Sequence, residues 1–170
     1  MTIVLPVAMV LLLDSGRTLT AEQVKTRIAS NGPKATLSEL HDDPAQWAAI
    51  TAGISTGSPT WLEVAVSLKR ISDGGASEEL NLCLADGLIR DPKSVLAAIH
   101  LPDSPFATEE VCGNYEAAPE TARRAGVLRW LKRQEVAIRR VGVETLQTAR
   151  RECLSAILRA KSDAKEHVPE

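Results

Sequence analysis

Three times between residues 43 and 92, a capping residue is followed at once by proline and then by an apolar helical stripe. The three pairs are Asp43-Pro44, Ser58-Pro59 and Asp91-Pro92. An Asp or Ser side chain accepts a hydrogen bond from an unpaired amide of the first helical turn. Proline suits the first helical position, because its missing N–H would have no partner there. Since little β-branched alternation separates these starts, the pattern predicts short helices in succession and an all-α fold.

Composition agrees with this prediction. The chain has 170 residues, of which 44% are hydrophobic, but only five are aromatic. A domain of this length can bury a substantial core. That core must consist mostly of Leu, Ala, Val and Ile, which a helix accommodates well. The tryptophans Trp47, Trp61 and Trp130 are expected to be its few large anchors.

Prolines, glycines and apolar spacing divide the chain into about seven or eight helices. A capping box at Thr20 and Gln23 starts the first helix. The expected helices cover residues 21–31, 33–40, 44–57, 59–71, 77–90, 92–99, 119–141 and 143–161. We expect one domain over residues 20–161, with an irregular excursion at 100–118 and a polar tail at 162–170. Repeated helix pairs predict an irregular stack of antiparallel pairs, a HEAT-like α-solenoid or right-angled bundle.

Residues 3–13 form an unbroken apolar run, IVLPVAMVLLL. A helix needs about 20 residues to span a bilayer, so this run does not predict a membrane span. Its length is typical of the apolar part of a secretory signal, although no Lys or Arg precedes it. We expect a leader at residues 1–19 and a periplasmic or secreted protein. The alternative is a buried N-terminal helix or strand in a cytoplasmic protein.

Charge is divided unevenly along the chain. Residues 1–120 carry 8 Lys/Arg and 16 Asp/Glu, whereas residues 121–161 carry 11 and 3. This polarity indicates either an anionic partner for the basic segment or basic helices that lie against the acidic half of the same molecule. The second explanation is favoured, because positive charge near helix C-termini is common.

The three cysteines do not have the spacing of a zinc site or a thioredoxin motif. In an exported protein one disulfide is expected, and joining Cys112 to Cys153 would connect the irregular excursion to the last helix. Cys83 lies among leucines, where a thiol acts as a small hydrophobic group. The alternative is that Cys112 is a nucleophile with His100 as its base.

Other candidate chemistry is weak. His41 beside two aspartates could support a metal ion, but it suits an exposed turn better, so we predict no metal site and no cofactor. Adjacent glutamates such as Glu78 and Glu79 point about 100° apart on a helix and do not share a site. The isolated glycines form no phosphate-binding loop, and no GxSxG serine motif is present.

A set of short motifs resembles a family of small secreted, all-helical proteobacterial proteins. Matching positions are residues 32–36 (GPKAT), Trp47, 57–62 (GSPTWL), 72–78 (SDGGASE), 90–96 (RDPKSVL), 111–112 (VC) and 153–154 (CL). The resemblance covers most of residues 30–155. It implies an exported, all-helical protein in which Cys112 and Cys153 pair, and it implies no activity.

Three functions are compatible with the sequence. The first is a non-catalytic exported protein that binds a protein partner, similar in role to an inhibitor or immunity protein. The second is a hydrolase with a carboxylate site near Asp73 and Glu78. The third is a cytosolic nucleic-acid binder, which is disfavoured because its arginines occur around several faces of the long helix. For partner binding, the expected surface residues are Asp73, Glu78, Glu79, Arg123, Arg124, Arg129, Lys132 and Arg133.

Overall fold

A computed structural model describes residues 19–119 and 123–170 of the chain. Within this part all regular structure is helical, so the all-α class is confirmed. The α-helices are α1 (Ala21–Asn31), α2 (Pro33–His41), α3 (Pro44–Ile54), α4 (Pro59–Lys69), α5 (Gly74–Arg90), α6 (Pro92–Ile99), α7 (Thr108–Val111), α8 (Arg124–Arg139) and α9 (Gln147–His167). Two 3₁₀ turns, η1 (Tyr115–Ala117) and η2 (Glu144–Leu146), complete the described elements.

The proline-marked helix starts occur where the sequence predicts them. Asp43 accepts hydrogen bonds from the amides of Ala45 and Gln46, and Asp91 accepts one from the amide of Ser94. Ser58 makes no such side-chain bond, although α4 still begins at Pro59. The fixed φ of proline is therefore sufficient to start this helix without a side-chain cap.

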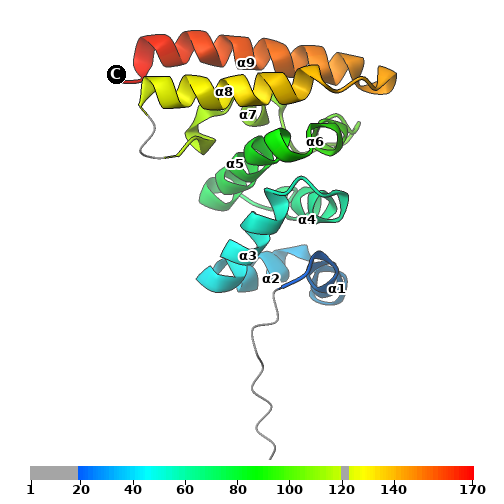
Figure 1. Ribbon diagram of the computed structural model, residues 1–170. Coiled ribbons are helices and arrows are strands. Elements are labelled where there is room, and N and C mark those ends of the chain that lie inside the picture. Colours follow the sequence, from blue (N-terminus) through cyan, green and yellow to red (C-terminus); the bar gives the residue numbers. More distant parts are fainter. Residues whose placement is uncertain (1–18, 120–122) are drawn as a thin grey trace, which may run out of the picture.

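The helices form successive tiers, with α1 and α2 at one end and α8 and α9 at the other (Figure 1). Within this stack, α3 contacts α5 and α5 contacts α8, which makes one layer. In the second layer α1 contacts α4, α4 contacts α6, and α6 contacts α9. Consecutive helices therefore alternate between the two layers from α3 to α6. The closer likeness to HEAT repeats stays a prediction.

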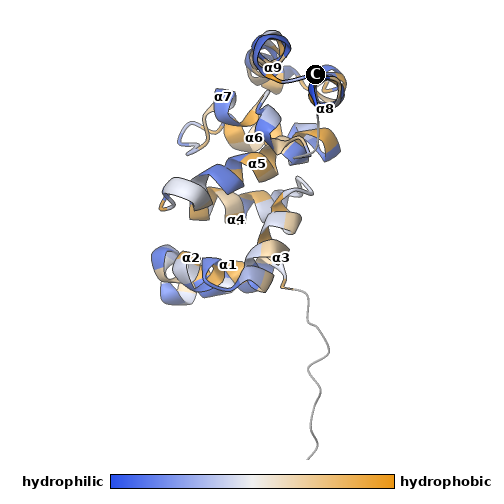
Figure 2. Ribbon diagram, turned by 90° about the vertical axis from the view of Figure 1, so that its left-hand side faces the viewer, coloured by the Kyte–Doolittle hydropathy of each residue, from blue (hydrophilic) through white to orange (hydrophobic). Residues whose placement is uncertain are grey.

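Helix α5 lies in the middle of the stack and is buried on several sides. Figure 2 shows hydrophobic colouring on α6 and on part of α5, whereas much of α9 is hydrophilic. Leu80, Leu84 and Leu88 of α5 have no exposed surface. At the end of this helix, Gly87 lies so close to Gly57 that a Cβ on Gly87 would be 3.4 Å from the Gly57 Cα. Two glycines thus allow α5 to approach the chain between α3 and α4.

Several expected features differ from the structure, including the start of the last helix, which is Gln147 rather than residue 143. A one-turn helix, α7, forms inside the excursion expected to be irregular, so the described helices outnumber the expected seven or eight. The polar tail expected from residue 162 is instead helical to His167, because Ala164 packs in a core cluster with Trp130 and Leu131. The long basic helix begins at Arg124 rather than near residue 119. The predicted leader covers residues 1–19. Of these, only Leu19 belongs to the part of the chain that the structure describes.

A disulfide links the excursion after α7 to α9. Cys112 and Cys153 are both buried and bonded through sulfur, with their Cα atoms 5.1 Å apart. The next residue, Gly113, has φ of +80°, and a Cβ there would be 2.9 Å from the carbonyl oxygen of Ala156. Its amide donates to the Oε1 of buried Gln134 at 3.3 Å. The excursion is therefore fastened to both helices of the last tier.

Removing this disulfide should lower stability substantially. The chain-entropy argument for a bridge spanning 41 residues gives about 4 kcal/mol of unfolding free energy. We expect C112A/C153A to show a loss near this size in urea unfolding at neutral pH. Cys83→Ala is the control, because it removes a buried sulfur that closes no loop. Equal losses in the two variants would contradict the stabilising role of the bridge.

Candidate functional site

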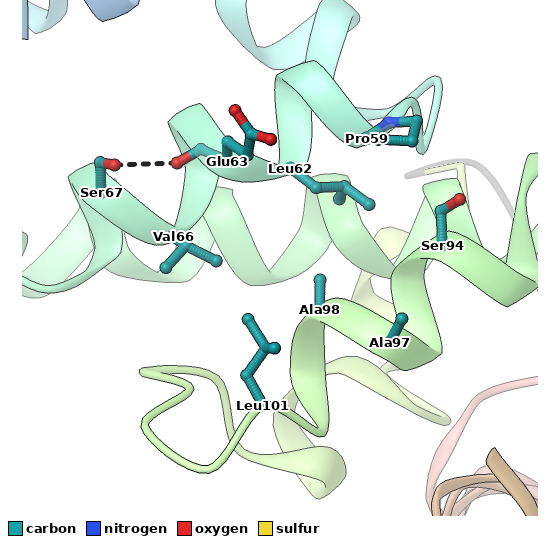
Figure 3. Close-up of a pocket in the computed structure, with 9 residues that line it drawn as sticks. All are labelled: Pro59, Leu62, Glu63, Val66, Ser67, Ser94, Ala97, Ala98 and Leu101. Atoms are coloured by element: carbon teal, nitrogen blue, oxygen red, sulfur yellow. Dashed lines mark hydrogen bonds between the residues drawn. The ribbon is translucent and has the colours of Figure 1, made fainter. Parts of the chain in front are cut away.

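An apolar groove opens between α4 and α6. It has a volume of about 510 Å³. We call it the α4/α6 groove; its lining residues are Pro59, Leu62, Glu63, Val66, Ser67, Ser94, Ala97, Ala98 and Leu101. Figure 3 shows Leu62 and Val66 directed from α4 toward the space that Ala98 and Leu101 border from the α6 side. Leu101, directly after α6, is 50% exposed, which is high for a leucine beside a core.

The lining has the spacing of a helix-packing surface. On α4 the lining positions are 59, 62, 63, 66 and 67, and near α6 they are 94, 97, 98 and 101. Each set repeats at three and four residues, which places its members on one helical face. Ala97, Ala98 and the two serines are small, so another backbone could approach closely. The groove therefore has the shape of a seam between two helices that could accept a third.

The polar edge of the groove is held by an ion pair. The Lys25 Nζ of α1 lies 2.7 Å from the Glu63 carboxylate. That hydrogen bond raises the pKa of Lys25 above its ordinary value. Figure 3 shows the Ser67 hydroxyl bonded to the Glu63 carbonyl oxygen, at 2.9 Å. Because these polar groups have partners on α1 and within α4, the open part of the groove remains mainly apolar.

The acidic residues expected to bind a partner lie at the start of α5. Asp73 precedes the helix, makes no side-chain capping bond and is exposed. It borders a shallow hollow of about 370 Å³ that does not include Glu78. Glu79 accepts a hydrogen bond from the indole Nε1 of Trp47. The structure therefore separates these carboxylates into different surroundings.

The basic residues of the expected surface lie on or beside α8. Arg123 donates to the Glu170 carbonyl oxygen, and Arg124 forms an ion pair with the Glu170 carboxylate at 2.9 Å. Lys132 is paired with Glu135. A hollow of about 610 Å³, which we call the α8 hollow, is lined by Pro119, Arg123, Ala125, Gly126, Arg129, Trp130 and Arg133. Among the described residues no hydrogen bond or ion pair joins an acidic member of the expected surface to a basic one.

The two charged halves of the chain are barely paired with each other. Among the described residues, a single ion pair joins the basic segment 123–161 to the acidic tiers, between Arg159 and Glu109 at 3.7 Å. The other ion pairs of the basic segment stay within the last tier. The basic helices do lie against the acidic half, as expected, because α8 contacts α5 and α6, and α9 contacts α6 and α7. Most of their basic side chains, however, form no ion pair with a described residue of that half. The last tier keeps its positive charge exposed.

A polar cluster next to α5 contains residues that the sequence analysis missed. The Lys69 side chain has an exposure of only 7%, and it donates to the carbonyl and hydroxyl oxygens of Ser77. Its ammonium lies 3.7 Å from the Glu110 carboxylate and 5.6 Å from the Phe106 ring centroid. These contacts of Lys69 connect α4 with α5 and with the segment that contains Phe106 and α7.

Glu135 is a nearly buried carboxylate surrounded by cations of the last tier. It accepts hydrogen bonds from Lys161, Arg139 and Lys132. These bonds hold its pKa at about 2, well below the ordinary 4.5. One negative charge thus faces three positive charges, and the cluster keeps a net positive charge.

The structure removes one candidate nucleophile and gives no support to a metal centre. The Cys112 sulfur is in the disulfide, so it cannot act as a thiolate with His100. His41 makes an edge contact with the Trp47 ring, with 4.9 Å between ring centroids. In residues 19–119 and 123–170, no His, Cys, Asp and Glu side chains gather in a group suited to metal binding. None of the helices in these ranges is long and apolar enough to cross a membrane.

Comparisons of the chain with protein-family models, curated proteins and solved structures found no match. The resemblance to secreted proteobacterial proteins therefore stays a prediction.

The effect of Glu135 should depend on pH in a defined direction. The pKa of Glu135 in the folded protein lies below the ordinary value. Its contribution to the free energy of unfolding is therefore full above pH 4.5 and is lost as the pH falls toward 2. We expect Glu135→Gln to lower the free energy of unfolding by about 1 kcal/mol at neutral pH. The difference in this free energy between the variant and wild type should shrink as the pH falls from 4.5 toward 2. Urea unfolding at several pH values measures it. Glu144→Gln is the control, and the same pH trend in both variants would contradict the role of Glu135.

Thiol titration should separate the three cysteines. Burial raises the pKa of the Cys83 thiol to about 11, so this thiol is protonated and unreactive at neutral pH. We expect protein purified from its native source without reductant to react slowly with a thiol reagent when folded. After unfolding it should react with one equivalent per chain. Three equivalents would contradict the disulfide.

Proposed function

We propose that this chain is a non-catalytic, exported protein that binds a protein partner through the α4/α6 groove. The observation that carries the proposal is the pair of apolar stripes, at helical spacing, that border one open groove. The occupant we propose is an amphipathic helix of the partner. Its apolar side chains would repeat at three and four residues, as do those of the groove. A cationic side chain at its edge would lie near Glu63, which is 62% exposed.

Export is supported by two independent features of the chain. The apolar run at residues 3–13 has the length of a secretory signal's apolar part. A buried disulfide is typical of proteins from oxidising compartments such as the periplasm. A binding protein of the inhibitor or immunity type agrees with both features, and it requires no catalytic group of its own.

The competing enzyme hypothesis has less support. It placed a carboxylate site near Asp73 and Glu78, but these two residues do not line a common hollow. The Ser77 hydroxyl, in the same region, accepts a hydrogen bond from Lys69, whose Nζ also lies 3.7 Å from the Glu110 carboxylate. Partner binding uses the groove, an apolar feature to which these observations give no structural role.

Site-specific photocrosslinking tests the groove. A benzoylphenylalanine at Ala97, which is exposed inside the groove, should form an adduct in the envelope fraction of the native source. Mass spectrometry of the adduct should identify an apolar-striped helical segment of another protein. The Leu101→Lys variant should reduce the adduct about tenfold, since it places a charge against the apolar stripe, without changing the urea midpoint.

The matched control carries the same crosslinker at Ala45, an exposed alanine of α3 outside the groove. Equal adduct yields from both positions would contradict the proposal. An adduct with residues 3–13 of the same chain would assign the groove to that segment. An adduct with a second copy would assign it to self-association, and either result would overturn partner binding at this surface.

A further inference from the structure

The exposed side of α8 carries arginines in a row. Arg129 and Arg133 of α8, and Arg140 directly after its last residue, are all exposed. At 100° per residue they fall within about 40° of one another around the helix, over a length of about 16 Å. The sequence analysis placed the arginines of this segment around several faces, but these three share one face. They form a positively charged surface at the end of the stack.

This row is not neutralised within the described part of the protein. Lys132 and Arg139, beside the row, are paired with Glu135. Arg129 and Arg133, in contrast, have no hydrogen bond or ion pair with any described residue. Like charges four residues apart on a helix repel each other. A bound anion would relieve that repulsion. Because neither Arg129 nor Arg133 is paired with a described carboxylate, binding would not break an ion pair between them and the described residues.

The α8 hollow combines these charges with an apolar floor. Its lining includes Pro119, Ala125 and Trp130, and the Trp130 residue is only 6% exposed. The guanidinium groups of Arg129 and Arg133 stand at its border, four residues apart. Guanidinium forks bind carboxylates through two parallel hydrogen bonds. Gly126 contributes no side chain, so a bound chain could lie close to the helix backbone.

We propose that the α8 hollow is a second binding site, for an acidic segment of a protein partner. Carboxylates of that segment would bind Arg129 and Arg133, and an adjacent apolar side chain would cover Pro119 and the edge of Trp130. The site is separate from the α4/α6 groove and does not depend on what occupies that groove.

An acidic peptide suits this surface better than a nucleic acid does. Single-stranded nucleic acids are held by aromatic rings that stack on the bases, together with a continuous cationic track. The aromatic ring here belongs to Trp130, a residue that is only 6% exposed and so offers little surface for stacking. Two flanking cations, Lys132 and Arg139, are already engaged by Glu135. The short row and the apolar floor fit carboxylates beside an apolar side chain.

Fluorescence anisotropy with three labelled probes tests the site. The probes are a short peptide in which glutamates alternate with leucines, its glutamine counterpart, and a single-stranded oligothymidylate of equal charge. We expect the glutamate peptide to bind the full-length protein most tightly and the glutamine peptide not to bind. R129E/R133E should weaken glutamate-peptide binding at least about tenfold.

The matched control is K34E/K93E, which changes the net charge by the same amount at exposed lysines outside the α8 hollow. It should leave peptide binding within about twofold of wild type. Circular dichroism and urea unfolding verify that both variants fold. Leu101→Lys should also leave peptide binding unchanged, which separates this site from the groove.

Three outcomes would overturn the proposal. Equal weakening by the two charge-reversal variants would show that net charge alone attracts the peptide. Tighter binding of the oligothymidylate, lost in R129E/R133E, would assign the surface to phosphodiesters. Absence of peptide binding at low salt would show that the arginine row binds no acidic segment.

Discussion

Helix α5 packs against other helices on many sides, because it runs through the middle of the stack. It contacts α3, α4, α6, α7 and α8, and its leucines are fully buried between them. Such burial requires small residues where backbones come close, as at Gly87 against Gly57. The positions of the other tiers, and hence of both proposed binding surfaces, depend on how α5 packs.

The last tier is attached to this centre by polar and covalent links rather than by apolar contact alone. Gln134, fully buried on α8, donates to the Ala85 carbonyl oxygen of α5 at 2.8 Å and accepts from the Gly113 amide. Cys112, the residue before Gly113, is bonded through sulfur to Cys153 of α9. A buried side-chain amide with both ends satisfied favours one orientation of the helices it joins. The last tier can therefore carry a surplus of exposed positive charge on a well-anchored support.

The groove and the arginine row differ in the kind of partner they suit. The groove offers apolar stripes of α4 and α6, where burial of apolar area would supply binding free energy. The row on α8 offers guanidinium groups that have no partner among the described residues, and there charge would govern orientation and association rate more than affinity. A partner that used both surfaces would contribute an apolar helix and an acidic segment.

Several features of the fold could be predicted because their causes are local. Proline after Asp43, Ser58 and Asp91 predicted three helix starts, since the φ of proline and the missing N–H act within one turn. The extent of α9 could not be predicted in this way. Residues after 161 are polar, and the helix continues because Ala164 finds a buried place against α8.

The candidate surfaces were likewise predictable from the sequence only in part. The apolar stripe of α4, which includes Leu62 and Val66, is visible in the sequence. It is wider than the surface that a single neighbouring helix would cover. Only the packing of α6 alongside α4 turned it into a groove. The basic character of residues 121–161 is likewise a property of the sequence. Which arginines are neutralised was decided by tertiary structure, because Glu135 and Glu170 can each reach only the cations that the fold brings close.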